Sequence, residues 1–129
     1  MAAIPNSKSS VHIPPLILDE WSDSATFNAW FQQHKPDVIV TPDYEAISKL
    51  AAGLNMSVPK NLGIASLSSP ESGSKVSGIF QNGHFIGSSA VDLLIDLVER
   101  HERGLPPQAT ALMVEGQWNP GQTLRAQRV

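Results

Sequence analysis

The feature that most constrains the fold is a strand–helix–strand pattern between Pro36 and Leu67. The pattern begins with a short β-branched run, which is typical of a strand buried on both faces of a parallel sheet. This run is Val38, Ile39 and Val40. Asp43 then provides a favourable helix N-cap, and the apolar residues that follow it recur at helical spacing. They are Ile47, Leu50, Ala51 and Leu54.

A second apolar run at residues 62–67 completes the pattern as a returning strand. Because the connecting loops are short, we expect a right-handed crossover between two parallel strands. Ligands of such sheets bind beyond the carboxyl ends of the strands. Here those ends are residues 41–44 and 66–69, so a candidate site is predicted there.

The rest of the chain supplies further elements of an α/β domain. In order, we predict a strand at 11–18, a helix at 23–35, a crossing segment at 76–81, a helix at 82–103 and a strand at 109–117. In the helix at 23–35 the core-facing residues are Phe27, Trp30, Phe31 and His34. The predicted fold class is α/β, a three-layer α/β/α arrangement with a mostly parallel sheet.

Composition restricts the possible functions. The chain has 129 residues, which suits one domain, and its net charge of −3 argues against binding nucleic acid unaided. It contains no cysteine, which excludes disulfides and thiolate metal sites. No apolar run approaches the roughly 20 residues of a membrane helix, and the first ten residues lack a secretory h-region. We therefore expect a cytoplasmic protein that does not contact the membrane.

No catalytic or metal-binding motif stands out. The four histidines, His12, His34, His84 and His101, have no metal-ligand spacing. The chain has no nucleophile elbow, no phosphate-binding loop and no distinguishable pair of catalytic carboxylates. We therefore expect a protein that is not an enzyme and that uses no cofactor.

Several segments, in the right order, resemble the effector-binding region of the lactose- and galactose-repressor (LacI/GalR) family of transcription regulators. The segments are Pro36-Asp37-Val38-Ile39-Val40 with Asp43, Val58-Pro59 with Leu62-Gly63-Ile64-Ala65-Ser66, Val76-Ser77-Gly78-Ile79-Phe80-Gln81-Asn82, and Ile86-Gly87 with Ala90-Val91 and Leu93-Leu94. The resemblance implies one lobe of a type I periplasmic-binding-protein fold. It also implies a small effector, most often a sugar, bound between two lobes.

The resemblance sets the expected organisation. Residues 11–125 would be the C-terminal part of the effector-binding domain, with residues 82–103 as its crossover helix. Residues 1–10 and 126–129 would be tails. A helix-turn-helix, a hinge and a complete N-terminal lobe are lacking from this sequence. The chain would then be a fragment or a stand-alone remnant of a regulator, without direct nucleic-acid contact.

The resemblance also implies the site residues. Trp21 matches an aromatic residue that stacks on the sugar, Gln81 a polar residue near the effector, and Asp43 the acidic residue that opens a helix. The fourth and fifth candidates are Ser68, which stands where the family has an aspartate that grips sugar hydroxyls, and Tyr44 at the helix start. Pro42 replaces an asparagine of the family pattern and removes an amide.

Each candidate also has a purely structural interpretation. Trp21 could cover the core as a loop aromatic, Asp43 could only cap its helix, and Tyr44 could lie on the helix surface. Ser68 is an ordinary turn residue unless a cleft forms. The apolar side of the helix at 82–103 would need a partner, either by folding back or in a homodimer. An alternative function is therefore a non-catalytic, self-associating interaction module that has lost effector binding.

Overall fold

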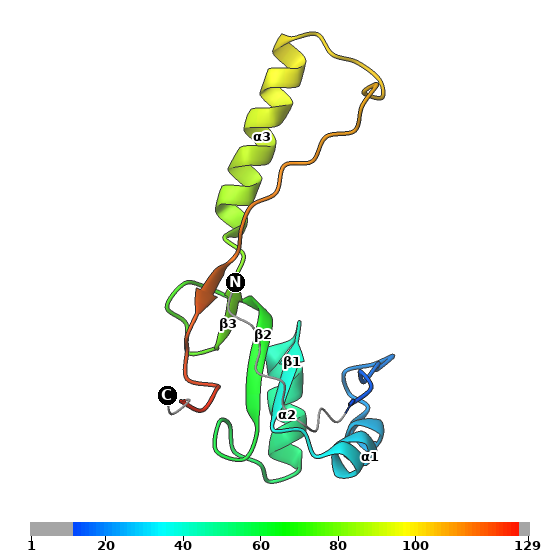
Figure 1. Cartoon of the computed structure of the whole chain (residues 1–129), viewed down its shortest axis with the longest axis vertical. Coiled ribbons are helices and arrows are strands. Elements are labelled where there is room, and N and C mark those ends of the chain that lie inside the picture. Colours follow the sequence, from blue (N-terminus) through cyan, green and yellow to red (C-terminus); the bar gives the residue numbers. More distant parts are fainter. Residues whose placement is uncertain (1–11, 127–129) are drawn as a thin grey trace.

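The computed structural model describes residues 12–126 of the chain. It has α/β architecture, in which helices accompany a mostly parallel four-stranded sheet with the strand order β1-β2-β3-β4 (Figure 1). The elements follow the chain as α1 (Ser24–His34), β1 (Val38–Thr41), α2 (Tyr44–Gly53), β2 (Gly63–Ser69), β3 (Gly78–Phe80), α3 (Gly83–Glu99) and β4 (Gln117–Asn119). The predicted strand–helix–strand unit is thus present as β1, α2 and β2.

The pairing of the strands confirms the predicted parallel crossover. β1 runs parallel to β2, with Val38 opposite Gly63 and Thr41 opposite Ser66. β2 is also parallel to β3, although the register shifts between Ser66 and Ser69. β4 pairs antiparallel with β3 and forms the other edge of the sheet. Three neighbouring strands therefore point their carboxyl ends the same way.

Local caps set the beginnings and ends of the helices. Asp23 and Asp43 each accept a hydrogen bond at 3.0 Å from the backbone N–H three residues on, which caps α1 and α2. Lys35 ends α1 in a left-handed conformation, with φ of 45°. α3 ends at Glu99, short of the predicted 103, and His101 adopts a left-handed φ of 55° shortly afterwards.

The hydrophobic core lies on one face of β1 and β2. Its buried members are Phe27, Ile39, Ile47, Leu50, Ala51, Leu62 and Ile64. They come from α1, α2 and the inner face of the two strands, apart from Leu62, which directly precedes β2. The prediction that β1 is buried on both faces was wrong, because Val38 and Val40 are 47% and 64% exposed. β1 is an edge strand, and within residues 12–126 no layer covers its second face.

Two predicted strands differ from the structure. Residues 12–18 form an extended segment without strand pairing, and residue 11 of the predicted strand lies outside the described residues. Pro14 and Pro15 lack backbone donors, so this segment cannot form a regular ladder. It is attached to α1 instead, since Trp30 Nε1 donates to the Pro14 carbonyl at 3.1 Å. The strand predicted at 109–117 overlaps the observed strand, β4, only at Gln117, because β4 covers Gln117–Asn119.

Buried polar side chains fix the end of the chain to the sheet. Asn119 donates from its amide to the Val76 carbonyl at 2.7 Å and accepts from the Gly73 backbone N–H at 3.0 Å. Thr123 donates from its hydroxyl to the Ile64 carbonyl at 2.7 Å and accepts from the Ser77 N–H at 2.8 Å. These bonds hold the loop before β3 against the segment after β4.

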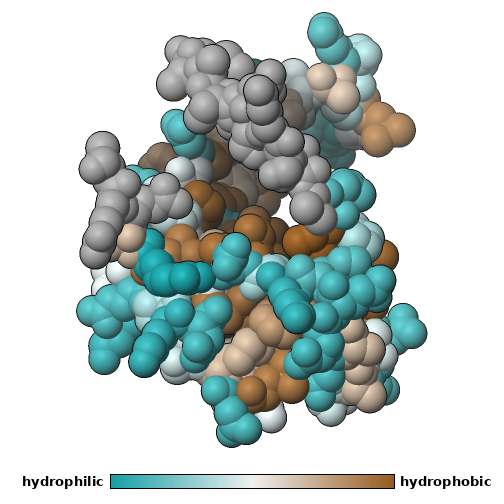
Figure 2. Space-filling model, turned by 60° about the horizontal axis from the view of Figure 1, so that its bottom comes forward, coloured by the Kyte–Doolittle hydropathy of each residue, from teal (hydrophilic) through white to brown (hydrophobic). Residues whose placement is uncertain are grey.

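α3 differs from the other helices because none of its residues is buried. Figure 1 shows it, with the returning segment in orange, projecting beyond the end of the sheet. In Figure 2 apolar surface, in brown, reaches the outside of the molecule between hydrophilic patches. The described part of the chain therefore leaves apolar surface exposed outside its core.

Candidate ligand site at the carboxyl edge of the sheet

Three of the predicted site residues follow the carboxyl ends of neighbouring strands. Asp43 is the second residue after β1, Ser68 lies in the last part of β2, and Gln81 directly follows β3. Because these strands are parallel neighbours, the topology brings the three residues to one edge of the sheet. Trp21 reaches the same region from the loop before α1, beside the end of β1.

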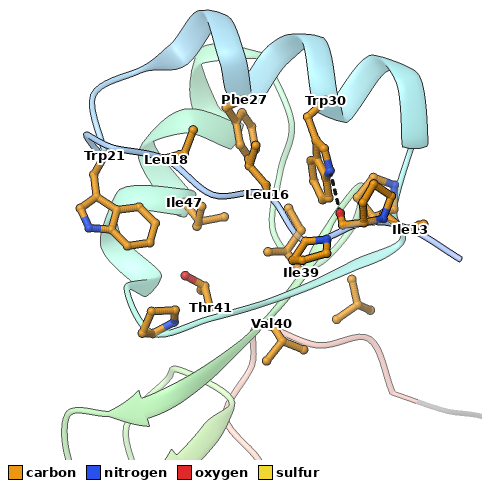
Figure 3. A pocket seen from close by; sticks show the side chains of 15 residues that line it. Ile13, Leu16, Leu18, Trp21, Phe27, Trp30, Ile39, Val40, Thr41 and Ile47 are labelled. Atoms are coloured by element: carbon orange, nitrogen blue, oxygen red, sulfur yellow. Dashed lines mark hydrogen bonds between the residues drawn. The ribbon is translucent and has the colours of Figure 1, made fainter.

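Trp21 stands at the junction of two hollows. A mostly apolar cavity of about 280 Å³ runs between the segment at residues 13–18, α1 and β1, and Trp21 lines it together with Thr41 and Pro42. Figure 3 shows Trp21 at one end of this cavity, with Ile47 and Thr41 nearby. A second, more open hollow of about 460 Å³ brings Trp21 together with Asp43. The indole is 45% exposed, so a ligand can reach it.

Asp43 has both a structural role and an accessible position. Its Oδ1 accepts from the Ala46 backbone N–H at 3.0 Å, which is the helix cap expected from the sequence. Its own backbone N–H donates to Thr41 Oγ1 at 3.1 Å, and the Thr41 hydroxyl donates to the Asp43 carbonyl at 3.2 Å. Because Thr41 is buried, these bonds fix the turn between β1 and α2.

Ser68 and Gln81 lie on the exposed part of the edge. Gln81 Nε2 donates to the Leu67 carbonyl at 3.1 Å, which ties the end of β3 to the end of β2. The Ser68 backbone N–H donates to Ser66 Oγ at 3.1 Å, so the turn is held by the residue two positions earlier. Ser68 and Gln81 therefore present neutral polar groups at the surface of this edge.

Tyr44 is placed differently from the other candidates. It is half-buried and packs against the hydrophobic core from the first residue of α2. The Tyr44 ring therefore contributes to core packing next to the candidate site.

Sequence reasoning missed two features of the site. The first is Thr41, whose paired hydrogen bonds hold the loop that carries Asp43. A threonine at the end of a β-branched run gives no sign of this role. The second is the apolar wall formed by Ile13, Leu16 and Leu18, because these residues were assigned to a strand.

The chemistry available at this edge is aromatic stacking and hydrogen bonding. Within the described range 12–126, no cluster of three or more histidine, aspartate or glutamate side chains could hold a metal ion. In the same part of the chain, no helix is long and apolar enough to cross a membrane. An aromatic face beside amide, hydroxyl and carboxylate groups suits a small ligand with one apolar face and several hydroxyls.

Comparisons of the chain with protein-family models, with curated proteins and with solved structures gave no match.

Proposed function

We propose that this chain is the ligand-sensing and dimer-forming part of a LacI/GalR-type transcription regulator that binds a small sugar-like effector. The observation that carries the proposal is the row of Trp21, Asp43, Ser68 and Gln81 along the carboxyl edge of a parallel sheet. Under this proposal the fold is one lobe of a three-layer, periplasmic-binding-protein-like domain that works in the cytoplasm. It performs no catalysis.

The row supplies the contacts that a sugar or polyol needs. The exposed indole of Trp21 would stack on the apolar face of a pyranose or on the carbon chain of a polyol. Ligand hydroxyls would bond to the Ser68 hydroxyl, to the Gln81 amide and to Asp43 Oδ2. Asp43 Oδ1 would continue to cap α2, which restricts the direction from which a hydroxyl can approach.

Sensing would follow from differential binding. An effector that prefers one arrangement of the ligand edge shifts the population toward that arrangement. In a regulator this shift changes the affinity of attached DNA-binding heads, by linkage between two sites. The chain itself would not contact DNA, in keeping with its net charge of −3.

Thermal unfolding against a panel of sugars, polyols and nucleobases tests the proposal. A ligand at about 100 times its dissociation constant adds about 2.7 kcal/mol, which raises Tm by several degrees. Trp21→Ala should abolish that shift, whereas Trp21→Phe, which keeps an aromatic face, should retain part of it. A panel without any selective shift, or a shift that survives in Trp21→Ala, contradicts the proposal.

A second candidate is a non-catalytic interaction module that has lost effector binding. The absence of any buried residue from α3 favours it, since an apolar helix of this kind requires a partner. Pro42, which replaces an asparagine of the family pattern and so removes an amide that could bond a ligand, points the same way. This candidate predicts self-association that no member of the ligand panel alters, measured by sedimentation with and without each ligand.

A further inference from the structure

Two apolar surfaces of the described chain lack a covering layer. One is the face of the sheet opposite α2, here called the open sheet face. It consists of Val38, Val40, Ala65, Leu67, Ile79 and Trp118. The other is the apolar side of α3. A bare sheet face needs a helix or a sheet against it, and a bare apolar helix needs the same.

The open sheet face extends from one edge of the sheet to the other. Val40 pairs with Ala65, and Ile79 pairs with Trp118, so apolar side chains continue across the strands. Leu67, Val40 and Trp118 are 50%, 64% and 55% exposed. None of the residues that define this face is charged, so its partner must be apolar as well.

The apolar side of α3 is unusually wide. At about 100° per residue, its apolar side chains occupy an arc of about 200°, which exceeds the stripe of an ordinary surface helix. The side chains that form this arc are Ile86, Ala90, Val91, Leu93, Leu94, Ile95, Leu97 and Val98, whereas Phe85 in the first turn lies outside it. Asp92, Asp96 and Glu99 lie on the opposite side. An arc of this width is typical of a helix that is buried against a broad surface such as a sheet.

From these two surfaces we infer that the chain forms a reciprocal homodimer in which α3 of each copy covers the open sheet face of the other. The occupant of each surface is thus a second copy of this chain. The exchange is isologous, because the same pair of surfaces is used twice around a two-fold axis. It gives each sheet helices on both faces.

The dimensions of the two surfaces agree. α3 has 17 residues, about 25 Å at about 1.5 Å per residue. β2 has seven residues, about 23 Å at about 3.3 Å per residue. α3 also projects beyond the carboxyl end of β3, away from its own sheet (Figure 1). A two-fold axis near Asn82 therefore lays each helix along the partner's strands instead of its own.

The size of the contact also favours an exchange over a one-sided contact. A stable interface buries about 800 Å² per partner and involves about 20–30 residues a side. α3 has 17 residues and the open sheet face is defined by six, so either surface alone falls short of that number of residues. In the reciprocal dimer each copy contributes both surfaces at once.

Thiol cross-linking tests this arrangement directly, because the chain has no cysteine of its own. Val40→Cys and Leu94→Cys are prepared as separate proteins, mixed, and treated with a short bis-maleimide. The expected product is a covalent dimer that forms in the mixture and in neither protein alone. The matched control replaces Leu94→Cys with Asp92→Cys, whose thiol lies on the polar side of α3 and should give no dimer.

Other products would overturn the inference. A dimer formed by Leu94→Cys alone would mean that two α3 helices pack on each other. A cross-link within one chain of the double variant, without a dimer, would mean that α3 folds back on its own sheet. The absence of any cross-link at concentrations where the chain is folded would mean that α3 meets no sheet of a second copy.

Light scattering after size exclusion provides an independent measurement. The parent should have twice the mass of the 13.9 kDa chain, and Leu94→Asp should weaken the dimer by about 30-fold or more. Because Leu94 is exposed within one copy, circular dichroism should show the variant still folded. Asp92→Asn should remain a dimer. A monomeric parent, or a dimer that Leu94→Asp leaves intact, contradicts the exchange.

This inference specifies the dimer formation included in the proposed function, and it does not depend on effector binding. Its failure is therefore separate from the failure of the sensor proposal. A ligand shift that Trp21→Ala abolishes can occur in a monomer. Cross-linking between Val40→Cys and Leu94→Cys can occur in a protein that binds no sugar.

Discussion

The side-chain amide of Gln81 donates to the backbone carbonyl of Leu67, with Nε2 and O 3.1 Å apart. This bond joins the carboxyl ends of β3 and β2 directly before the chain enters α3. It therefore fixes both the polar edge of the candidate site and the point from which α3 departs. One residue thus links the ligand edge to the proposed dimer surface.

Gln81→Glu tests this link with little change of shape. The carboxylate cannot donate to Leu67, so the bond is replaced by two acceptors facing each other. We expect a loss of about 1 kcal/mol in the free energy of unfolding, measured by urea denaturation, because the exposed site lets water compensate. The ligand-induced rise of Tm should shrink as well. Gln108→Glu, in the exposed segment after α3, adds the same charge and should change neither quantity.

Replacing Asn119 should have a larger effect on stability, because its side chain is buried and both its amide nitrogen and its amide oxygen form hydrogen bonds. Its nitrogen donates to the carbonyls of Ser74 and Val76, and its oxygen accepts from the Gly73 N–H. Asn119→Asp would place a carboxylate against two carbonyl oxygens at a site only 6% exposed. We expect a loss of about 3 kcal/mol with an unchanged urea m-value. A loss below about 1 kcal/mol would show that the loop rearranges instead.

The sequence predicted the central unit because its signals are local. The β-branched run, the Asp43 cap and the helical spacing after it all act within a few residues, and β1, α2 and β2 follow from them. The exposure of Val38 and Val40 was missed for the opposite reason. A β-branched strand has the same sequence pattern whether or not a second layer covers it.

The predicted last strand was misplaced because its partner strand, β3, is short. β3 has only the three residues Gly78–Phe80, so β4 can pair over no more than Gln117–Asn119. The candidate site was predicted in outline, since topology alone brings Asp43, Ser68 and Gln81 to one edge. The role of Thr41 was not predictable, because its hydrogen bonds depend on a turn geometry that the sequence pattern does not specify.

Replacing either of two glycines by alanine should change stability in opposite directions. A Cβ at Gly78 would overlap the backbone carbonyl of Ser66 on the neighbouring strand, so Gly78→Ala must push β3 away from β2. We expect a loss of at least about 2 kcal/mol in unfolding free energy. A Cβ at Gly53, at the end of α2, meets no atom within 4 Å, and Gly53→Ala should stabilise by up to about 1 kcal/mol. Equal effects in thermal unfolding would contradict this account.

The last prediction concerns the acid stability of α1. The Thr26 hydroxyl, and then the Thr26 backbone N–H, donate to Asp23 and lower the pKa of this carboxyl below its ordinary value of 3.8. A pKa that is lower in the folded state stabilises the fold above the ordinary value and loses that contribution as pH falls through the folded value. The carboxylate contribution of Asp23 should therefore be present at pH 5 and diminish below about pH 4.

Asp23→Asn isolates this contribution, because asparagine also caps helices but does not titrate. Urea denaturation at pH 5 and pH 3 should show a smaller loss of stability for Asp23→Asn than for the parent. Asp23→Ala removes the cap at every pH, so it should be less stable than Asp23→Asn at both values. If the parent and Asp23→Asn lose the same stability between pH 5 and pH 3, the hydrogen bonds from Thr26 do not favour the charged carboxylate in solution.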